Sequence, residues 1–336
     1  MHVVAAPDKF RGTASAREVA AAVARAVLAV GGTCDEAPVA DGGSGTLDAL
    51  GGTPHRSTVR GPLGDPVAAE WRMQGDGTAV VEMARASGLA LVGGAEGNDP
   101  LRASTAGTGE LIAAALDGGA SRVVVGAGGS ASTDGGLAAL TALNPRRRLH
   151  AGVELLVACD VETLFVDAAE VFAPQKGATP AQVALLRRRL ERLAQIYLRD
   201  YGVDVRDEPG SGAAGGLAGG LAAAGAVLVP GFELVADALS LAERITGADL
   251  VVTGEGLLDA ESFAGSAVGG VVELALAAGV PVLVVAGDVL DAEVPELPAS
   301  VRVVSLVARF GLERAVAEVG ACVEEVVESA IRGAGG

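Results

Sequence analysis

Short runs of branched apolar residues recur along this chain, and glycine-rich loops and amphipathic helices follow them. The first run, at residues 3–6, leads into the loop PDKFRGT and a helix that begins at Ser15, where Glu18 completes a capping box. A second run, at about residues 36–40, leads into DGGSGT and another helix. Strand, helix and strand in this order form a βαβ unit, which implies a parallel sheet. The sequence therefore predicts an α/β protein.

The two ends of the chain share this pattern, whereas the middle differs from them. Three buried strands, DLVVTGEG, PVLVVAGD and VRVVSLV, follow one another towards the C-terminus. From about residue 58, the segments VAAEWRM and TAVVEMA alternate in a way that is typical of antiparallel strands. We expect one doubly wound, flavodoxin- or Rossmann-like parallel sheet built from residues 1–57 and 236–336, with a second, mixed α/β domain inserted at residues 58–235.

The inserted segment contains strands and helices of its own. RVVVGA and LLVACD are predicted strands, and we expect helices to begin at Thr108 and at Thr179, where Pro180 occupies the first helical position. The stretch from Gly210 to Val229 has no charge over twenty residues, but seven of them are glycine and only five are large and apolar. We interpret it as a glycine-rich loop and a buried helix, not as a membrane span.

Composition disfavours several classes of function. Aromatic residues make up only 3% of the chain and the formal net charge is −17, which argues against nucleic-acid binding. Three widely spaced cysteines and a start without a signal peptide predict reduced thiols and a cytoplasmic location. The sequence contains no P-loop motif and no GxSxG elbow. The three histidines lie outside the glycine-rich loops, so a His-ligated zinc or a Ser-His-Asp triad is also disfavoured.

Four loops that follow predicted strands combine glycine with acidic or hydroxyl residues. They contain Asp8 and Lys9; Asp41 to Thr46; Gly128 to Ser130 with Asp134; and Gly254 to Gly256 with Asp259. In open parallel sheets, ligands bind beyond the carboxyl ends of the strands. Glycine frees backbone N–H groups for phosphate oxygens, and neighbouring carboxylates suit Mg²⁺ or a substrate hydroxyl. Each loop alone could be only a tight turn, but together they favour a phosphate or nucleotide site.

Lysine is rare in this chain. Of 25 basic residues only two are lysine, Lys9 and Lys176, and both stand in dense polar motifs. An ammonium group on a flexible stem cannot always be replaced by the planar guanidinium of arginine. We therefore expect both lysines to hold an anionic ligand, the alternative being that they were retained by chance.

With these loops identified, the chain resembles the type I glycerate kinase family, the bacterial ATP-dependent glycerate 2-kinases, from end to end. The segments that carry the resemblance are APDKFRGTASA, VADGGSGTLDAL, GTGELI, GGSASTDGG, ACDV, FAPQKGAT, GAAGGL and VVTGEGLLDA. The resemblance implies two α/β domains with the active site in the cleft between them. It implies transfer of the ATP γ-phosphoryl group to a hydroxyl of D-glycerate, or of a related small hydroxy acid, with Mg²⁺. Whether the protein forms a homodimer is left open by this resemblance.

The resemblance and the loops together suggest roles for individual residues. Lys9, Asp41, Asp134 and Glu255 are the expected catalytic residues, and Asp160 and Asp259 are candidate metal ligands. Asp134, Asp160 and Glu255 are candidates for the base or for Mg²⁺ binding, and the sequence does not assign these roles among them. Lys9 and Arg11 are expected to hold the substrate carboxylate or the transferred phosphoryl group, and Lys176 to bind phosphate. The remaining expected substrate- or phosphate-binding residues are Asp8, Gly42, Gly43, Ser44, Gly128, Gly129 and Ser130.

The chain departs from the family pattern at several positions. Leu257 and Ser266 stand where the family has arginine and lysine, and Ser44 and Thr133 replace a glutamate and an asparagine. The segment at residues 144–154 is shorter than the corresponding segment of the family. These departures motivate an alternative: a catalytically weak paralogue that binds a nucleotide or an acid and acts as a sensor or interaction protein. A nicotinamide dehydrogenase is disfavoured, because no GxGxxG stands at the first βα turn.

Overall fold

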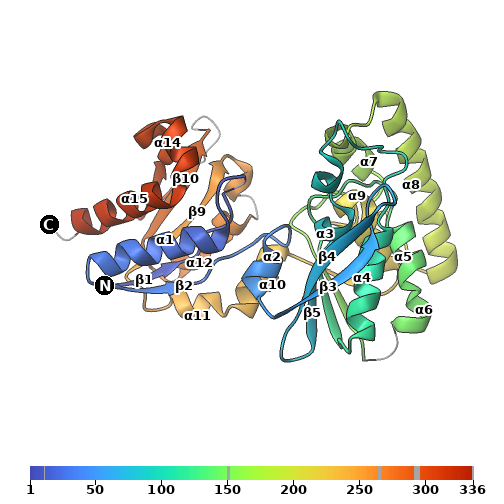
Figure 1. Cartoon of the computed structure of the whole chain (residues 1–336), viewed down its shortest axis with the longest axis horizontal. Helices are drawn as coiled ribbons and strands as arrows, with labels where there is room; N and C mark the ends of the chain where they lie inside the picture. Colours follow the sequence, from blue (N-terminus) through green and yellow to red (C-terminus); the bar gives the residue numbers. More distant parts are fainter. Residues whose placement is uncertain (11, 150–151, 264–265, 291–295, 335–336) are drawn as a thin grey trace. The chain divides into compact units, whose positions relative to one another are not determined.

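The computed structural model of the chain describes residues 1–10, 12–149, 152–263, 266–290 and 296–334 (Figure 1). The chain divides into two compact units, which we call unit 1, residues 1–41 and 232–336, and unit 2, residues 42–231. The expected division at residue 57 instead falls inside strand β3 (Thr53–Arg60), which pairs with β4 (Pro66–Met73) along its whole length. The expected division at residue 235 falls inside α10 (Gly231–Ala238), whose Phe232 and Ala236 pack into the core of unit 1.

Unit 1 is built on a five-stranded sheet with the order β11-β10-β9-β1-β2, in which all neighbours are parallel. The strands are β1 (His2–Ala5), β2 (Thr33–Glu36), β9 (Leu250–Leu258), β10 (Val282–Val289) and β11 (Val301–Ser305). Both ends of the chain therefore contribute to one parallel sheet, as predicted. The strand order reverses between β1 and β9, because the chain continues from β1 to β2 on one side and from β9 to β10 and β11 on the other.

Helices cover both faces of this sheet because alternate residues of each strand point to opposite sides. Val3 and Ala5 pack with α1 (Ala16–Ala29) and α15 (Val319–Ala334), which lie side by side in Figure 1. Val4 packs on the other face with α12 (Ala267–Ala277), α10 and α11 (Leu241–Ile245). Two short helices, α13 (Leu306–Phe310) and α14 (Leu312–Ala317), precede α15. The capping box of Ser15 and Glu18 at the start of α1 is confirmed.

Unit 2 is built on a six-stranded mixed sheet with the order β3-β4-β5-β6-β7-β8. The pairs β3–β4 and β4–β5 are antiparallel, as predicted, and the strands from β5 to β8 are parallel. These four are β5 (Thr78–Glu82), β6 (Arg122–Gly126), β7 (Glu154–Ala158) and β8 (Val227–Val229). Its longer helices are α4 (Ala106–Asp117), α8 (Pro180–Tyr201) and α9 (Ala213–Ala223), and its shorter ones are α2 (Thr46–Leu50), α3 (Ala84–Ser87), α5 (Leu137–Leu143), α6 (Pro145–Arg148) and α7 (Ala168–Phe172), with 3₁₀ turns at Leu89–Val92 and Pro174–Lys176.

Two element boundaries differ from the prediction. Strand β2 ends at Glu36 instead of beginning there, because its partner β1 ends at Ala5 and is soon followed by Pro7, which has no N–H to donate. Helix α4 begins at Ala106, after Thr105, and Thr108 lies in its first turn, where its hydroxyl donates to Ser87 Oγ. The capping box of Thr179 is confirmed, and α9 is the predicted buried helix. Among the described residues, no helix has both the length and the apolar content needed to cross a membrane.

Candidate active site

In unit 1, the loop after β1 emerges where the order of the strands reverses. The backbone N–H of Asp8 donates to the carbonyl of Gly254, with a distance of 2.9 Å, which joins this loop to β9. A side chain at Gly254 is excluded, because its Cβ would lie 1.8 Å from the carbonyl oxygen of Val285 on β10. Asp8 and Lys9 thus lie at the carboxyl end of β1 beside β9. In doubly wound sheets, this position is where ligands bind.

Lys9 joins two carboxylates of unit 1. Its Nζ lies 3.2 Å from Asp8 Oδ2 and 3.6 Å from Asp41 Oδ1. The Asp8 side chain is 9% exposed and the Asp41 side chain 27% exposed, so Asp41 is the more accessible carboxylate. Burial raises the pKa of Asp8 above its ordinary value, the charge of Lys9 opposes this rise, and the charge of Asp41 adds to it. The three residues therefore form a compact, asymmetric charge cluster with one protected and one accessible carboxylate.

The other expected residues of unit 1 have different surroundings. Glu255 lies in β9 directly after Gly254 and is partly buried. Asp259 Oδ1 accepts hydrogen bonds from the N–H and hydroxyl of Ser262, so this carboxylate stabilises the turn at Glu261–Phe263. The side chain of Leu257 is 46% exposed. Arg11 lies outside the described residues.

In unit 2, the loop from Gly42 to Thr46 is held by a carboxylate that the sequence analysis missed. Glu82, the last residue of β5, is buried, and its Oε1 accepts hydrogen bonds from the N–H groups of Gly45 at 2.8 Å and Leu47 at 3.0 Å. Its other oxygen accepts from Arg85 Nε at 3.1 Å. The amino end of α2 is thus already neutralised by a protein carboxylate. The sequence signal that could have identified Glu82 is its position as an acidic residue at the end of the otherwise apolar strand TAVVE.

Close packing explains several of the glycines in these loops. A Cβ on Gly42, which has a φ of +80°, would lie 2.9 Å from Gly231 Cα, and one on Gly128 would lie 2.8 Å from Gly43 Cα. A Cβ on Gly126 would lie 2.5 Å from the carbonyl oxygen of Gly42. The loop after β6 and the Gly42–Gly43 backbone are therefore in contact, and both lie at the carboxyl end of the parallel strands. Ser44 and Gly129 are exposed.

Lys176 and Ser130 belong to a buried polar cluster beneath the loop after β6. Lys176 is 4% exposed, and its Nζ donates to the carbonyl of Ser132 at 2.6 Å. The hydroxyls of Ser130 and Ser132 lie 3.1 Å apart, and Ser130 Oγ also lies 3.3 Å from the carbonyl oxygen of Ala214. Burial lowers the pKa of Lys176 to about 7, and the negative charge of Asp134 opposes this shift. The ammonium group of Lys176 therefore holds the loop from inside the protein.

Asp134 connects the amino ends of two helices. Its carboxylate accepts from the N–H of Thr105 at 2.9 Å, from the hydroxyl of Thr105 at 2.9 Å and 3.0 Å, and from the N–H of Gly136 at 3.1 Å. Thr105 precedes α4 and Gly136 precedes α5. Burial raises the pKa of Asp134, and these hydrogen bonds and Lys176 oppose the rise. Asp160 Oδ1 accepts from the N–H of Gly231 at 2.6 Å, at the end of unit 2.

The structure thus brings the expected residues into two groups, one in each unit. Unit 1 assembles Asp8, Lys9 and Asp41, and unit 2 packs the backbones of Gly42, Gly43 and Gly128 against one another, with Ser130, Asp134 and Lys176 in the same unit. Within the described ranges, no three or more His, Cys, Asp and Glu side chains are grouped as a metal cluster would require.

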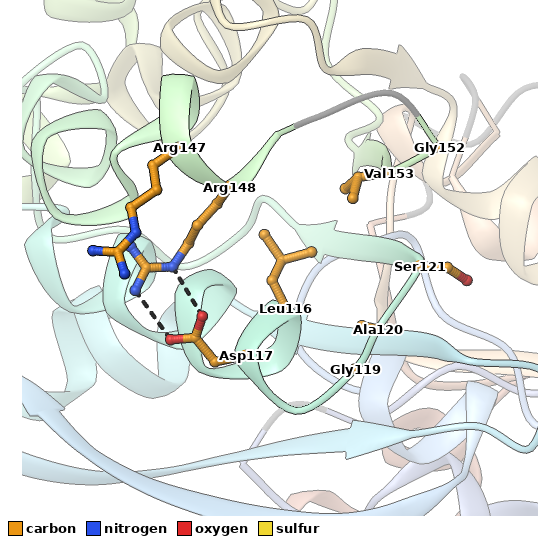
Figure 2. Close-up of a pocket in the computed structure, with 9 residues that line it drawn as sticks. All are labelled: Leu116, Asp117, Gly119, Ala120, Ser121, Arg147, Arg148, Gly152 and Val153. Carbon is orange, nitrogen blue, oxygen red and sulfur yellow. Dashed lines mark hydrogen bonds and ion pairs between the residues drawn. The ribbon is translucent and has the colours of Figure 1, made fainter.

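A pocket of about 420 Å³ lies elsewhere in unit 2, at the amino ends of β6 and β7 (Figure 2). Ser121 and Val153, the residues before these two strands, line it together with Arg147 and Arg148. The guanidinium of Arg148 holds Asp117 at 3.2 Å and 3.0 Å. The pocket contains none of the expected site residues and lies at the opposite end of the strands from Glu82 and Gly128. We therefore do not assign it to the active site.

Comparison with known proteins gives a consistent result over nearly the whole chain. The model of the glycerate kinase family matches residues 3–149 and 144–334. The two matches overlap at residues 144–149.

Individual relatives cover most of their own length as well. Glycerate 2-kinase of Escherichia coli is 39% identical over 329 residues, which cover 87% of this chain and 86% of the relative. Glycerate kinase of Bacillus subtilis is 39% identical over 327 residues, which cover 86% and 85%. A solved structure from Salmonella typhimurium LT2, assigned as glycerate kinase 2, matches with a TM-score of 0.80 and 35% identity over 99% of both chains. The chain belongs to the glycerate kinase family.

Proposed function

We propose that this protein transfers the γ-phosphoryl group of ATP to a hydroxyl of D-glycerate, or of a closely similar small hydroxy acid, with Mg²⁺. The observation that carries the proposal is the cluster of Asp8, Lys9 and Asp41 at the point where the strand order of unit 1 reverses. The similarity to glycerate 2-kinase of Escherichia coli supports this choice of substrate.

The geometry of the cluster suggests a division of roles. Phosphoryl transfer depends on positioning and on neutralising charge more than on covalent chemistry. Asp41 is the accessible carboxylate, so we assign it to the substrate hydroxyl, whose proton it would accept. Lys9 would stabilise the negative charge of the phosphoryl oxygens, and Asp8, which is buried beside it, would orient the ammonium group. The raised pKa of Asp8 is consistent with a carboxylate that is kept from water.

The side chains of unit 1 fit a bound Mg²⁺ in the way usual for kinases. Such enzymes hold Mg²⁺ through one or two carboxylates together with the substrate phosphates, not through a complete protein cage. Glu255 lies in β9, which borders the reversal point, and its carboxylate offers hard oxygen donors, so we assign Mg²⁺ binding to Glu255. Bound Mg²⁺ would neutralise charge on the β- and γ-phosphates.

The alternative function, a sensor with weak or no catalysis, is favoured by one observation. Leu257 lies in β9 two residues after Glu255, and its apolar side chain is 46% exposed at a position where the family has arginine. An apolar side chain cannot pair with a carboxylate or phosphate. Such a protein would bind ligand without turnover.

A coupled assay of ADP release separates the two functions. Purified protein is assayed with ATP and Mg²⁺ over a panel of small hydroxy acids that includes D-glycerate, and ³¹P NMR identifies the phosphorylated position. We expect ADP release that requires D-glycerate and is lost with excess EDTA. Asp41→Asn should lower kcat by at least about 100-fold, within the usual contribution of a positioned base. The matched control is Asp237→Asn, which changes an exposed aspartate of unit 1. Ligand binding without acid-dependent ADP release would favour the sensor.

A further inference from the structure

Arg85 follows the carboxyl end of β5 and is held in place by Glu82. Its Nε donates to Glu82 Oε2 at 3.1 Å, and while the Glu82 side chain is 2% exposed, that of Arg85 is 47% exposed. A guanidinium carries five N–H donors in a planar fork. The bond through Nε leaves the edge formed by Nη1 and Nη2 for a second partner, and bidentate binding through this edge suits carboxylate and phosphate groups.

Arg85 is connected to both glycine-rich loops of unit 2. Glu82, its partner, accepts the N–H groups of Gly45 and Leu47. The residues after Arg85 run along the other loop: the N–H of Leu89 donates to Gly129 at 2.8 Å, and the carbonyl of Ser87 accepts from Ala131 at 3.0 Å. A Cβ on Gly129 would lie 3.3 Å from Ala84 Cβ. The guanidinium is therefore carried by a short segment that is fixed between the loops.

Two other cations close to these loops are engaged by the protein itself. Lys176 is buried and donates to Ser132. Arg72 donates to the carbonyl of Leu47 at 2.8 Å and to Asp48 at 2.7 Å. Arg85 differs from both, because it combines a fixed Nε contact with an exposed side chain at the ligand-binding end of the sheet.

We propose that Arg85 binds the anionic group of a ligand, either the carboxylate of the hydroxy acid or a phosphate of the nucleotide, and that Glu82 is its positioning residue. This proposal rests on the proposed function and extends it. The carboxylate of Glu82 fixes the guanidinium before ligand arrives, so less side-chain entropy is lost on binding. Arg85 thereby helps to determine which acid or nucleotide the enzyme accepts.

Binding measurements on matched variants test the proposal without depending on turnover. Arg85→Gln removes the charge, and the control Arg122→Gln removes a guanidinium that also contacts a glutamate through Nε and whose side chain is 49% exposed, but at the amino end of β6. Calorimetric titrations with D-glycerate and with Mg-ATP are carried out separately on each protein. We expect Arg85→Gln to raise Kd about tenfold or more for one ligand, since a charged hydrogen bond contributes roughly that much. A raised Kd for D-glycerate identifies the carboxylate, and a raised Kd for Mg-ATP identifies the phosphate. Arg122→Gln should leave both values unchanged.

The role of Glu82 is tested with Glu82→Gln, which retains an oxygen acceptor for Gly45 and Leu47 but removes the charge beside Arg85. This variant should raise Kd for the same ligand, and the effects of Glu82→Gln and Arg85→Gln should not add in the double variant. If Arg85→Gln does not fold, Arg85→Lys keeps the charge without the fork and should still weaken binding. Unchanged Kd values for both ligands in the folded Arg85 variant would overturn the role of Arg85 alone. Wild-type protein that binds neither ligand would overturn this role and the proposed function together.

Discussion

The ammonium group of Lys176 donates a hydrogen bond to the carbonyl oxygen of Ser132, with an Nζ–O distance of 2.6 Å. The lysine lies at the end of a 3₁₀ turn and the serine in the loop after β6, so the bond links segments that are far apart in the sequence. A charge buried at such a contact affects the stability of the fold as well as the shape of the loop.

Replacing Lys176 should change how stability depends on pH. Its pKa is lowered to about 7 in the folded protein, whereas an unfolded chain binds this proton up to about pH 10.4. Between these values the unfolded state binds more protons, so the lysine makes the free energy of unfolding rise by up to about 1.4 kcal/mol per pH unit. The stabilisation gained in this way is complete above about pH 10.4, declines as the pH falls, and is lost once the pH has fallen through 7, where both states carry the proton. Chemical denaturation at pH 6, 7.5 and 9 should therefore show wild type gaining stability relative to Lys176→Met as the pH increases. A constant difference across this range would contradict the buried, titrating lysine.

Lys9 should affect catalysis much more than stability. Lys9→Met removes the ammonium that lies 3.2 Å from Asp8 and 3.6 Å from Asp41. We expect kcat/KM to fall at least about tenfold, because contacts to a charged group contribute roughly 1.5–3 kcal/mol. Lys9→Arg should recover only part of the activity, since a planar fork does not reproduce the contacts of a compact ammonium. Steady-state kinetics and thermal melts on both variants provide the test. Wild-type kinetics in Lys9→Met would remove Lys9 from the active site.

Glu82 should contribute measurably to the stability of unit 2. Glu82→Ala leaves the N–H groups of Gly45 and Leu47 without this acceptor, and an unsatisfied buried group costs about 1–3 kcal/mol. The matched control is Glu154→Ala, whose carboxylate pairs with Arg122 but is 48% exposed, so the expected loss is about 0–1 kcal/mol. Urea denaturation of the three proteins compares these losses. Equal stability of the two variants would show that Glu82 does not hold the loop.

Restoring a cation at position 257 should improve binding of the acid. The side chain of Leu257 is 46% exposed, so arginine can be accommodated without disturbing the core. We expect Leu257→Arg to lower KM for D-glycerate, about tenfold for each 1.4 kcal/mol of binding regained, with little change in melting temperature. Ser266 is less suitable for the same test, because its hydroxyl donates to the carbonyl of Ser262 at 2.5 Å. An unchanged or higher KM would indicate that the acid is not bound near this strand.

Local signals predicted many elements of the fold correctly. The capping boxes of Ser15 and Thr179 identified two helix starts, and branched apolar runs identified β9, β10 and β11. Such signals depend on neighbouring residues, which is why they can be read from the sequence. The sequence predicts that α4 begins at Thr108, but the helix begins after Thr105, whose N–H donates to Asp134, a residue far along the chain.

The α/β class, the parallel sheet shared by both chain ends, and the loops at the ligand-binding ends of the strands could all be predicted from the order of the residues. The surroundings of each charged side chain, in contrast, became visible only in the folded chain. The fold separated the two lysines, placing Lys9 between two carboxylates and burying Lys176 against Ser132. It also revealed the link from Glu82 to Arg85 and to the loop at Gly45. Hydrophobic periodicity reports on which face of an element is buried, whereas the environment of a charge depends on contacts between residues that are distant in sequence.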